Sequence, residues 1–224
     1  FNSYEKKIIN KLALYHQKNF KDVIVLGTGG SSKAGRTFVQ IAYRTFGRNP
    51  KFPKITFLEN IDFQDFRDLF KKINLKKTGV IVISKSGETS ETLIQFLVFL
   101  TKFRINFQKK KIYKYFTVIT KKGNSSLRNL AKDFSINVID IDSNLSGRFS
   151  AFSPVGLLPA AISGLNTEKI MQGAKTLLDK SLKKQENAPF EGAALHYAAQ
   201  NSKINISVLL TYTERLRNFG FWHE

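Results

Sequence analysis

Three hydroxyl side chains lie within six residues, in the stretch Ser84-Lys-Ser-Gly-Glu-Thr89. The unbroken apolar, β-branched run Val80–Ile83 precedes them and predicts a strand that is buried on both faces. The apolar density of Glu91–Phe103 predicts a buried helix directly afterwards. The loop therefore brings hydroxyl donors to the place where a helix offers free backbone N–H groups and the positive end of its dipole. This combination suits an anion, most simply a phosphate.

The loop has two interpretations. A serine or threonine is a common cap of an ordinary strand-to-helix turn. In an anion site, Ser84, Ser86 and Thr89 would donate hydroxyl hydrogen bonds, and Gly87 would let the backbone approach the ligand. Because three hydroxyls, a lysine and a glycine in six residues exceed what a cap needs, we expect an anion site.

A glycine-rich turn, Gly27-Thr-Gly-Gly-Ser31, follows the first buried run, Asp22–Leu26. It has neither the G-x-G-x-x-G spacing of dinucleotide sites nor the G-x-x-x-x-G-K-[ST] pattern of phosphate loops. One interpretation is a tight turn whose glycines adopt positive φ. The other is a second loop that faces residues 84–89 across the top of a sheet. In that case Ser31 would offer another hydroxyl to the same ligand.

A third segment, Gly147-Arg-Phe-Ser150, follows a predicted strand at Ile136–Ile141. An arginine at the rim of the same site would stabilise an oxyanion or an enediolate. The alternative is a loop arginine, Arg148, that forms an ion pair with Asp140 or Asp142. The residues themselves leave both interpretations open.

The acidic residues and histidines offer no obvious base or metal ligand set. Glu88 and Glu91 lie beside the expected phosphate, where a like charge makes a poor base, so we expect both at helix starts. His16, His196 and His223 lie far apart in the sequence and predict no metal site. The chain has no cysteine, which excludes disulfides and thiolate metal ligands.

These segments need a scaffold, and the hydrophobic pattern predicts one. Five strands alternate with helices over about 140 residues, which is typical of a three-layer αβα sandwich with a five-stranded parallel sheet. Ligands of such sheets bind beyond the carboxyl ends of the strands. We expect strands at 22–26, 54–58, 80–83, 115–120 and 136–141, and helices at 4–17, 34–46, 63–73, 91–103 and 124–134.

The pattern changes after this α/β part. Residues 152–162, 167–184 and 189–201 read as helices, and Ile204–Leu210 as a strand without a neighbour unless it joins the first sheet. We expect residues 1–165 to form one domain, and 166–224 to form linking helices and the first strand of a second, similar domain. Phe149, Phe152 and Leu157 are expected in the core.

Composition narrows the possible partners. The 224 residues carry a net charge of +19, from 36 Lys and Arg against 17 Asp and Glu, which raises nucleic-acid binding as a hypothesis. The lysines are dispersed, however, and the densest run, Lys109–Lys111, falls in a predicted loop, so we expect no nucleic-acid partner. No run approaches the roughly 20 apolar residues of a membrane span. With no signal-peptide pattern and no cysteine, a cytoplasmic location is expected.

The three segments together resemble the glucose-6-phosphate isomerase family. Gly27–Ser31 resembles its Gly-Ile-Gly-Gly-Ser turn, and Ser84–Thr92 resembles its Ser-Lys-Thr-Phe-Thr-Thr-x-Glu-Thr loop. Ser146–Ala160 closely resembles its Gly-Gly-Arg-(Phe/Tyr)-Ser segment and the apolar helix after it. Ser86-Gly87 in place of Thr-Phe is closer to the general sugar-isomerase (SIS) domain pattern. The resemblance covers nearly the whole chain, most firmly residues 22–165.

The resemblance implies an αβα sandwich that interconverts glucose 6-phosphate and fructose 6-phosphate through a cis-enediolate. It also implies no metal or organic cofactor and, in the intact enzyme, a homodimer. Arg148 is then the catalytic residue that stabilises the enediolate. The residues implied to bind the phosphorylated hexose are Gly30, Ser31, Ser84, Lys85 (through its backbone), Ser86, Thr89 and Gly147.

One part of the family pattern is missing. The family's base is a glutamate in a Gln-x-x-x-Glu-Ser-x-Gly-Lys segment, and Asn218–Glu224 resembles the lead-in to it. The resemblance therefore implies that these 224 residues alone are inactive. Two alternatives remain: a bifunctional phosphoglucose/phosphomannose isomerase, and a non-catalytic sugar-phosphate-binding SIS domain. The segment Gly147–Ala161 argues against the second, because a sensor needs no enediolate arginine.

Overall fold

The computed structural model describes residues 3–43, 47–183 and 187–223. Five parallel strands form one sheet in the order β2-β1-β3-β4-β5, which confirms the predicted α/β fold. None of the helices within these ranges is long and apolar enough to cross a bilayer. The strands are β1 (Asp22–Leu26), β2 (Lys54–Leu58), β3 (Thr78–Ile83), β4 (Phe116–Lys121) and β5 (Asn137–Ile141).

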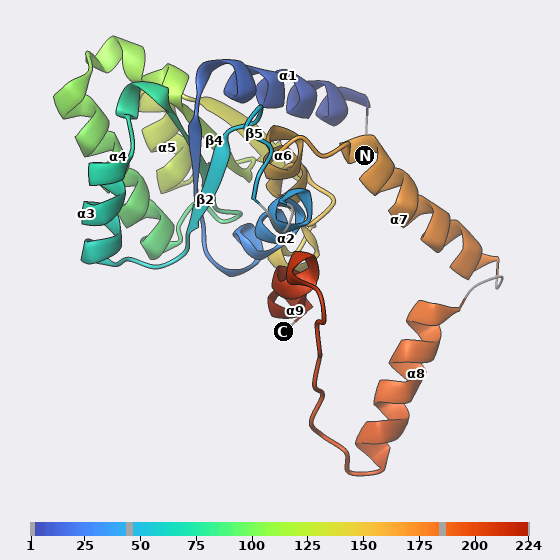
Figure 1. The fold of residues 1–224 in the computed structure, drawn as a ribbon. Coiled ribbons are helices and arrows are strands. Elements are labelled where there is room, and N and C mark those ends of the chain that lie inside the picture. The colour runs from blue at the N-terminus through green and yellow to red at the C-terminus, as the bar shows by residue number, and fades with distance from the viewer. Residues whose placement is uncertain (1–2, 44–46, 184–186, 224) are drawn as a thin grey trace.

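Helices cover both faces of the sheet and make the three layers (Figure 1). One face carries α1 (Ser3–Asn19), α2 (Lys33–Ala42) and α6 (Pro154–Ile162), and the other carries α3 (Phe63–Lys72), α4 (Ser90–Asn106) and α5 (Ser126–Asp133). The predicted helix 34–46 ends at Ala42, and residues 44–46 lie outside the described ranges.

The strand order reverses between β1 and β3, and this places two loops side by side. The chain passes from β1 outward to β2 and then returns to the other side of β1 as β3. Leu26 pairs with Val82, so Gly27 and Ile83 follow on neighbouring strands about 4.8 Å apart. Because the strands are parallel, both chains leave the sheet at its carboxyl edge, where open α/β sheets bind their ligands.

The helix that follows β3 is fixed by an aromatic cluster. Phe96, Phe99 and Phe103 on α4 are each fully buried. The Phe96 and Phe103 rings lie 5.6 Å and 5.0 Å from the ring of Phe116 on β4. Burial of such side chains contributes roughly 1.5–3 kcal/mol each. The amino end of α4 is thereby held in place at the carboxyl edge of the sheet.

Helix α6 anchors the loop that carries Arg148. All nine of its residues are buried, and the Ser153 hydroxyl accepts the Val155 N–H at its start. A Cβ atom on Gly35 of α2 would lie 3.2 Å from Pro159 and 3.3 Å from Phe57, so this glycine lets α2 pack closely on α6. The loop before α6 therefore starts from a rigid position.

His16 on α1 is buried between this helix and the sheet. Its ring is 1% exposed, and Nε2 lies 3.1 Å from the Thr117 hydroxyl on β4. The ring packs over Gly79, where a Cβ would come within 2.8 Å of Nδ1, and Nδ1 has no hydrogen-bond partner among the described residues. Burial lowers the pKa of His16 from 6.5 to about 4.

This burial predicts a pH-dependent stability. Between pH 4 and 6.5 the unfolded chain binds a proton at His16 that the folded chain does not, so the free energy of unfolding rises with pH over this range. Above pH 6.5 the contribution of His16 to stability reaches its full value. The free energy of unfolding should therefore be about 3 kcal/mol lower at pH 4 than at pH 7 through this group. Urea unfolding of His16→Gln should show a flatter profile, whereas His196→Gln, at an exposed position, should keep the wild-type profile. Parallel profiles for all three proteins would contradict the assignment.

The C-terminal part projects from the sandwich as an arm, defined by the described residues of 167–216 (Figure 1). It contains α7 (Thr167–Leu182), α8 (Ala188–Asn201) and an extended segment, and α9 (Arg217–His223) then returns to α2. The Thr37 hydroxyl donates to the Asn218 carbonyl at 2.9 Å, and the Arg215 guanidinium donates to the Ile41 carbonyl at 2.9 Å. The predicted helix 167–184 ends at Leu182, and residue 184 is not described.

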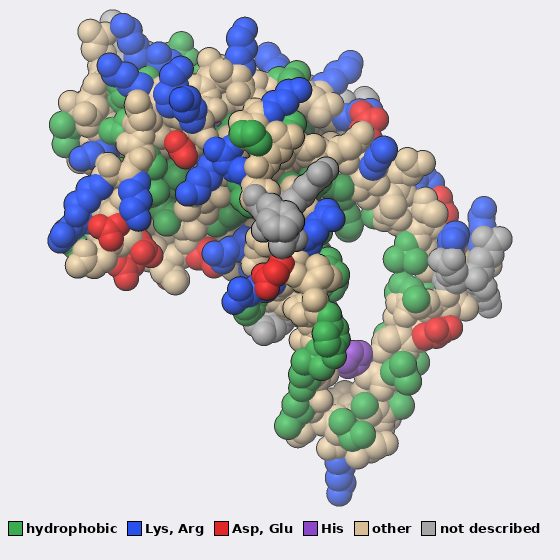
Figure 2. All heavy atoms as spheres, in the orientation of Figure 1, with side chains coloured by type: hydrophobic (Ala, Val, Ile, Leu, Met, Phe, Trp, Pro, Cys, Tyr) green, Lys and Arg blue, Asp and Glu red, His purple; other side chains and the backbone are tan. Residues whose placement is uncertain are grey.

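Two predictions about packing were wrong. Ile204–Leu210 is extended but forms no strand, because no edge in the described chain pairs with its backbone; Ile206 is 78% exposed. Apolar side chains gather along this arm (Figure 2). Phe149 and Phe152 are 74% and 45% exposed, because both lie in the surface loop before α6, whereas Leu157 is buried as expected.

Candidate functional site

The turn after β1 lies against the end of β3. Residues Gly29–Ser31 form one turn of 3₁₀ helix, and Gly29 has φ +53°. A Cβ on Gly27 would lie 2.8 Å from the Ile83 carbonyl oxygen, a distance that no side chain tolerates without a backbone shift. The glycines therefore serve the close approach of this turn to the loop after β3. The predicted side-by-side placement of the two loops is what the structure shows.

The loop after β3 gathers its three hydroxyls around Thr89. The Ser84 Oγ lies 3.1 Å from the Thr89 Oγ1, and the Ser86 Oγ lies 3.5 Å from it. Ser84 also accepts the Gly87 N–H, and Ser86 accepts the Glu88 N–H, both at 3.1 Å. The side chains singled out in the sequence therefore form one cluster at the start of α4.

This cluster does not act as a helix cap. Thr89 occupies the N-cap position of α4, but its side chain makes no capping hydrogen bond. The first-turn N–H groups of a helix have no partner within the helix. In α4 these N–H groups form the positive end of the helix dipole, and three hydroxyls lie beside them. This arrangement binds anions.

The same loop is held from the side of β4. The Lys85 carbonyl accepts the Lys121 N–H at 3.2 Å and the Thr120 hydroxyl at 3.3 Å. The Gly87 carbonyl accepts the Leu127 N–H at 3.0 Å. Gly87 has φ +73°, and a Cβ there would collide with the Ser125 side chain. These contacts occupy the carbonyl oxygens of Lys85 and Gly87 and fix the position of the loop before any ligand binds.

Glu88 has a structural role at a helix start, as expected, but on the neighbouring helix. Its carboxylate accepts the N–H and the hydroxyl of Ser126, each at 2.7 Å, at the first turn of α5. The backbone hydrogen bond from Ser126, followed by its hydroxyl, holds the pKa of Glu88 below its usual value. A carboxylate engaged in this way is a poor candidate for a general base.

The arginine loop contacts the glycine-rich turn where Gly147 lies against Gly30. Gly147–Phe149 form a 3₁₀ turn, and a Cβ on Gly30 would lie 2.5 Å from the Gly147 carbonyl and 3.0 Å from the Arg148 nitrogen. The Ser150 hydroxyl donates to the Gly147 carbonyl at 2.6 Å and to the Gly30 carbonyl at 3.3 Å. The fold thus brings Arg148 to the turn that also faces residues 84–89.

Arg148 does not form an ion pair with Asp140 or Asp142, which was one of the two interpretations of the sequence. Asp140 pairs with Arg128 at 2.6 Å, and Asp142 accepts the Asn144 N–H in its own turn. Within the described residues the exposed guanidinium of Arg148 has no hydrogen bond or ion pair. It is therefore free to bind an anionic group.

Glu59, after β2, is a site-supporting residue that the sequence reasoning missed. Its carboxylate accepts the Ser32 hydroxyl at 2.5 Å and pairs with Arg36 at 3.1 Å. It thereby holds the end of the glycine-rich turn and the start of α2. A single glutamate 27 residues from Ser32 gave no pattern from which this contact could be read. In the described ranges, no group of three or more His, Asp or Glu side chains is placed to hold a metal ion.

Comparison with known proteins places these features in a family. The sequence profile described as phosphoglucose isomerase matches residues 5–224. The chain is 33% identical over 214 residues to a probable glucose-6-phosphate isomerase of Methanococcus maripaludis, covering 93% of this chain and 47% of that protein. It is 34% identical over 227 residues to a glucose-6-phosphate isomerase of Carboxydothermus hydrogenoformans, covering 96% and 48%.

Solved structures show the same fold. A hypothetical protein of Thermus thermophilus has a TM-score of 0.84 and 25% identity, covering 98% of this chain and 51% of that chain. A glucose-6-phosphate isomerase of Chlamydia trachomatis has a TM-score of 0.68 and 23% identity, covering 81% and 34%. The chain spans about half the length of the curated relatives it matches. A profile match over nearly all residues, with the three segments in order, shows that the chain belongs to the phosphoglucose isomerase family.

Proposed function

We propose that the 224-residue chain forms the phosphate-binding and enediolate-stabilising half of an enzyme that interconverts glucose 6-phosphate and fructose 6-phosphate. The observation that carries the proposal is the hydroxyl cluster of Ser84, Ser86 and Thr89 at the start of α4, beside the Gly30–Gly147 contact. Family membership and the names of the relatives support the same reaction.

Binding of the phosphate follows from the donors at the carboxyl edge. The hydroxyls of Ser84, Ser86 and Thr89 would donate to phosphate oxygens, as would the backbone N–H groups at Lys85 and in the first turn of α4. A charge-assisted hydrogen bond contributes about 1.5–3 kcal/mol. Gly30 and Ser31 would line the same ligand from the turn after β1. The net charge of +19 adds a field that favours an anionic substrate.

The reacting end of the sugar would lie toward Gly147 and Arg148. Isomerisation removes a proton from C2 of the aldose, passes through an enediolate and returns a proton to C1, so negative charge develops on the oxygen at C1 or C2. The Arg148 guanidinium would stabilise that oxygen by charge and hydrogen bonding. The proton itself needs a base, which by the family resemblance is a glutamate beyond residue 224.

Three carboxylates near the site do not fill this role, because each is engaged in another contact. Glu59 is bound to Ser32 and Arg36, Glu88 to Ser126, and Asp140 to Arg128. We propose that residues 166–224 begin a second, similar domain that brings the base to the site. The projecting arm with exposed apolar side chains supports this division (Figure 2). A homodimer stays a prediction of the resemblance, and a cytoplasmic location stays a prediction of the sequence composition.

The phosphate site predicts a loss of affinity on removing its hydroxyls. Ser84→Ala and Thr89→Ala should each weaken binding of fructose 6-phosphate by roughly 10-fold or more, because each removes one hydrogen bond to a charged group. Isothermal titration calorimetry measures the change. Thr101→Ala removes an exposed hydroxyl from the same helix and should leave affinity unchanged. Equal affinity in all three variants would place the phosphate elsewhere.

A sugar-phosphate-binding domain without catalysis is the second candidate. The observation in its favour is that the described residues hold a cluster of phosphate donors, whereas the carboxylates of Glu59, Glu88 and Asp140 are each engaged in other contacts. It predicts that even the complete protein binds fructose 6-phosphate without converting it. Turnover of mannose 6-phosphate by the complete protein would instead indicate the bifunctional isomerase.

A further inference from the structure

A basic cavity lies at the amino edge of the sheet, opposite the edge that carries the substrate loops. It has a volume of about 400 Å³ and lies where β1, β2 and β3 begin. Its walls come from the end of α1, the segment before β2 and the turn before β3. The lining residues are Gln17, Lys18, Asn19, Phe20, Lys21, Arg48, Pro50, Lys51, Phe52, Pro53 and Lys77.

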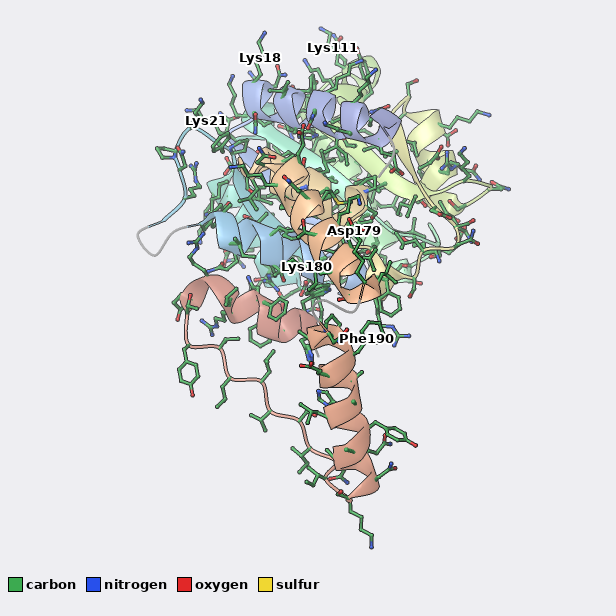
Figure 3. The ribbon with its side chains drawn as sticks, turned by 90° about the vertical axis from the view of Figure 1, so that its right-hand side faces the viewer. Lys18, Lys21, Lys111, Asp179, Lys180 and Phe190 are labelled. Carbon is green, nitrogen blue, oxygen red and sulfur yellow. The ribbon has the colours of Figure 1, made fainter. Side chains whose placement is uncertain are left out.

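Five of these side chains are cations and none is an acid. Lys18, Lys21, Arg48, Lys51 and Lys77 surround the cavity, and none forms an ion pair with another residue of the described ranges. Figure 3 shows Lys18 and Lys21 beside the end of α1 at the outer surface. Several like charges around one hollow repel one another unless an anion neutralises them.

Backbone hydrogen bonds fix the shape of this cavity, because they join the segments that form its walls. The Lys21 N–H donates to the Lys77 carbonyl at 2.8 Å, and the Lys54 N–H donates to the Lys21 carbonyl at 2.8 Å. The Arg48 guanidinium donates to the Phe52 carbonyl at 2.6 Å. The three segments that supply the cations are therefore joined to one another.

Stabilisation of the negative dipole end of α1 explains only part of the positive charge around the cavity. Helix α1 ends at Asn19, and cations near its last carbonyl groups are favoured by the dipole, which accounts for Lys18 and Lys21. It does not account for Arg48, Lys51 and Lys77, which come from other segments. The nearest carboxylate in sequence, Asp22, is not among the lining residues.

We propose that this cavity binds a small, multiply charged phosphate anion of the di- or triphosphate class. The volume falls within the usual range of about 300–1,000 Å³ for small-ligand sites. Lysine ammonium groups bind phosphates as point charges, and Arg48 adds the guanidinium donors that its hydrogen bond to Phe52 leaves unused. The five-residue strand β1 separates the cavity from Gly27 by about 13 Å or more, so the anion does not compete with the substrate phosphate.

The test uses inorganic tripolyphosphate as the probe. Calorimetric titrations are made in the Ser84→Ala/Thr89→Ala background, which weakens binding at the substrate loops. In that background, Lys21→Gln/Lys77→Gln should weaken tripolyphosphate binding by about 10-fold or more. Lys7→Gln/Lys11→Gln removes the same charge from exposed positions on α1 outside the cavity and should change binding by less than about 2-fold.

A second measurement locates the anion without substitutions. Acetylation of lysines in the unsubstituted protein, followed by mass spectrometry, should show Lys18, Lys21, Lys51 and Lys77 protected by tripolyphosphate and Lys7 unprotected. Equal losses in the two double variants, or uniform protection of all lysines, would overturn the proposal in favour of a general charge effect. No binding in the background variant would overturn it outright. Tighter binding of a single-stranded oligonucleotide, lost in both double variants, would indicate a nucleic-acid surface instead.

Discussion

In the complete protein, Arg148→Ala is expected to lower kcat by about 10²–10³, with a smaller change in KM. The guanidinium has no ion pair among the described residues, and its loop lies beside the turn that carries Gly30. Its positive charge is therefore available to a ligand bound there. Loss of one preorganised donor to a developing oxyanion typically costs this factor. Because the charge develops only in the transition state, kcat and kcat/KM should fall together.

Steady-state kinetics with fructose 6-phosphate test this prediction. Arg148→Lys keeps the charge but loses the planar donor pair, so it should recover part of kcat. Arg104→Ala removes an exposed arginine of α4 and serves as the matched control. A variant in which KM rises while kcat stays unchanged would make Arg148 a binding residue instead.

The 224-residue chain by itself is expected to bind fructose 6-phosphate and not to isomerise it. The phosphate donors are present, so part of the binding energy remains. The missing base alone should lower turnover by about 10²–10⁴ or more relative to the complete protein, because proton transfer between C1 and C2 needs a positioned acid–base group. Glu59, Glu88 and Asp140 are engaged in hydrogen bonds or ion pairs.

A coupled assay of the purified chain beside the complete protein checks this result. Calorimetry on the same sample shows whether the phosphate site is formed, and Ser84→Ala/Thr89→Ala should abolish the remaining binding. Binding without turnover agrees with a base outside these residues. Turnover equal to that of the complete protein would place the base within them, and our assignment would be wrong.

The parallel sheet could be predicted because its signals are local. The run Val80–Ile83 is apolar on both faces and becomes part of β3, which is buried along its whole length. The extended segment Ile204–Leu210 is also rich in β-branched and apolar residues, but it has no neighbour among the described residues to supply hydrogen bonds, and it forms no strand. A hydrophobic run determines the tendency to be a strand, whereas pairing depends on another part of the chain.

The sequence by itself determined which side chains could bind a phosphate, because hydroxyls, glycines and an arginine follow strands in recognisable order. Only the tertiary structure decided how they are used. The Gly30–Gly147 contact, the Ser126 partner of Glu88 and the Ser32 partner of Glu59 join residues between 27 and 117 positions apart. Such contacts depend on the strand order and on close packing between loops, which act over distances in space that no local pattern encodes.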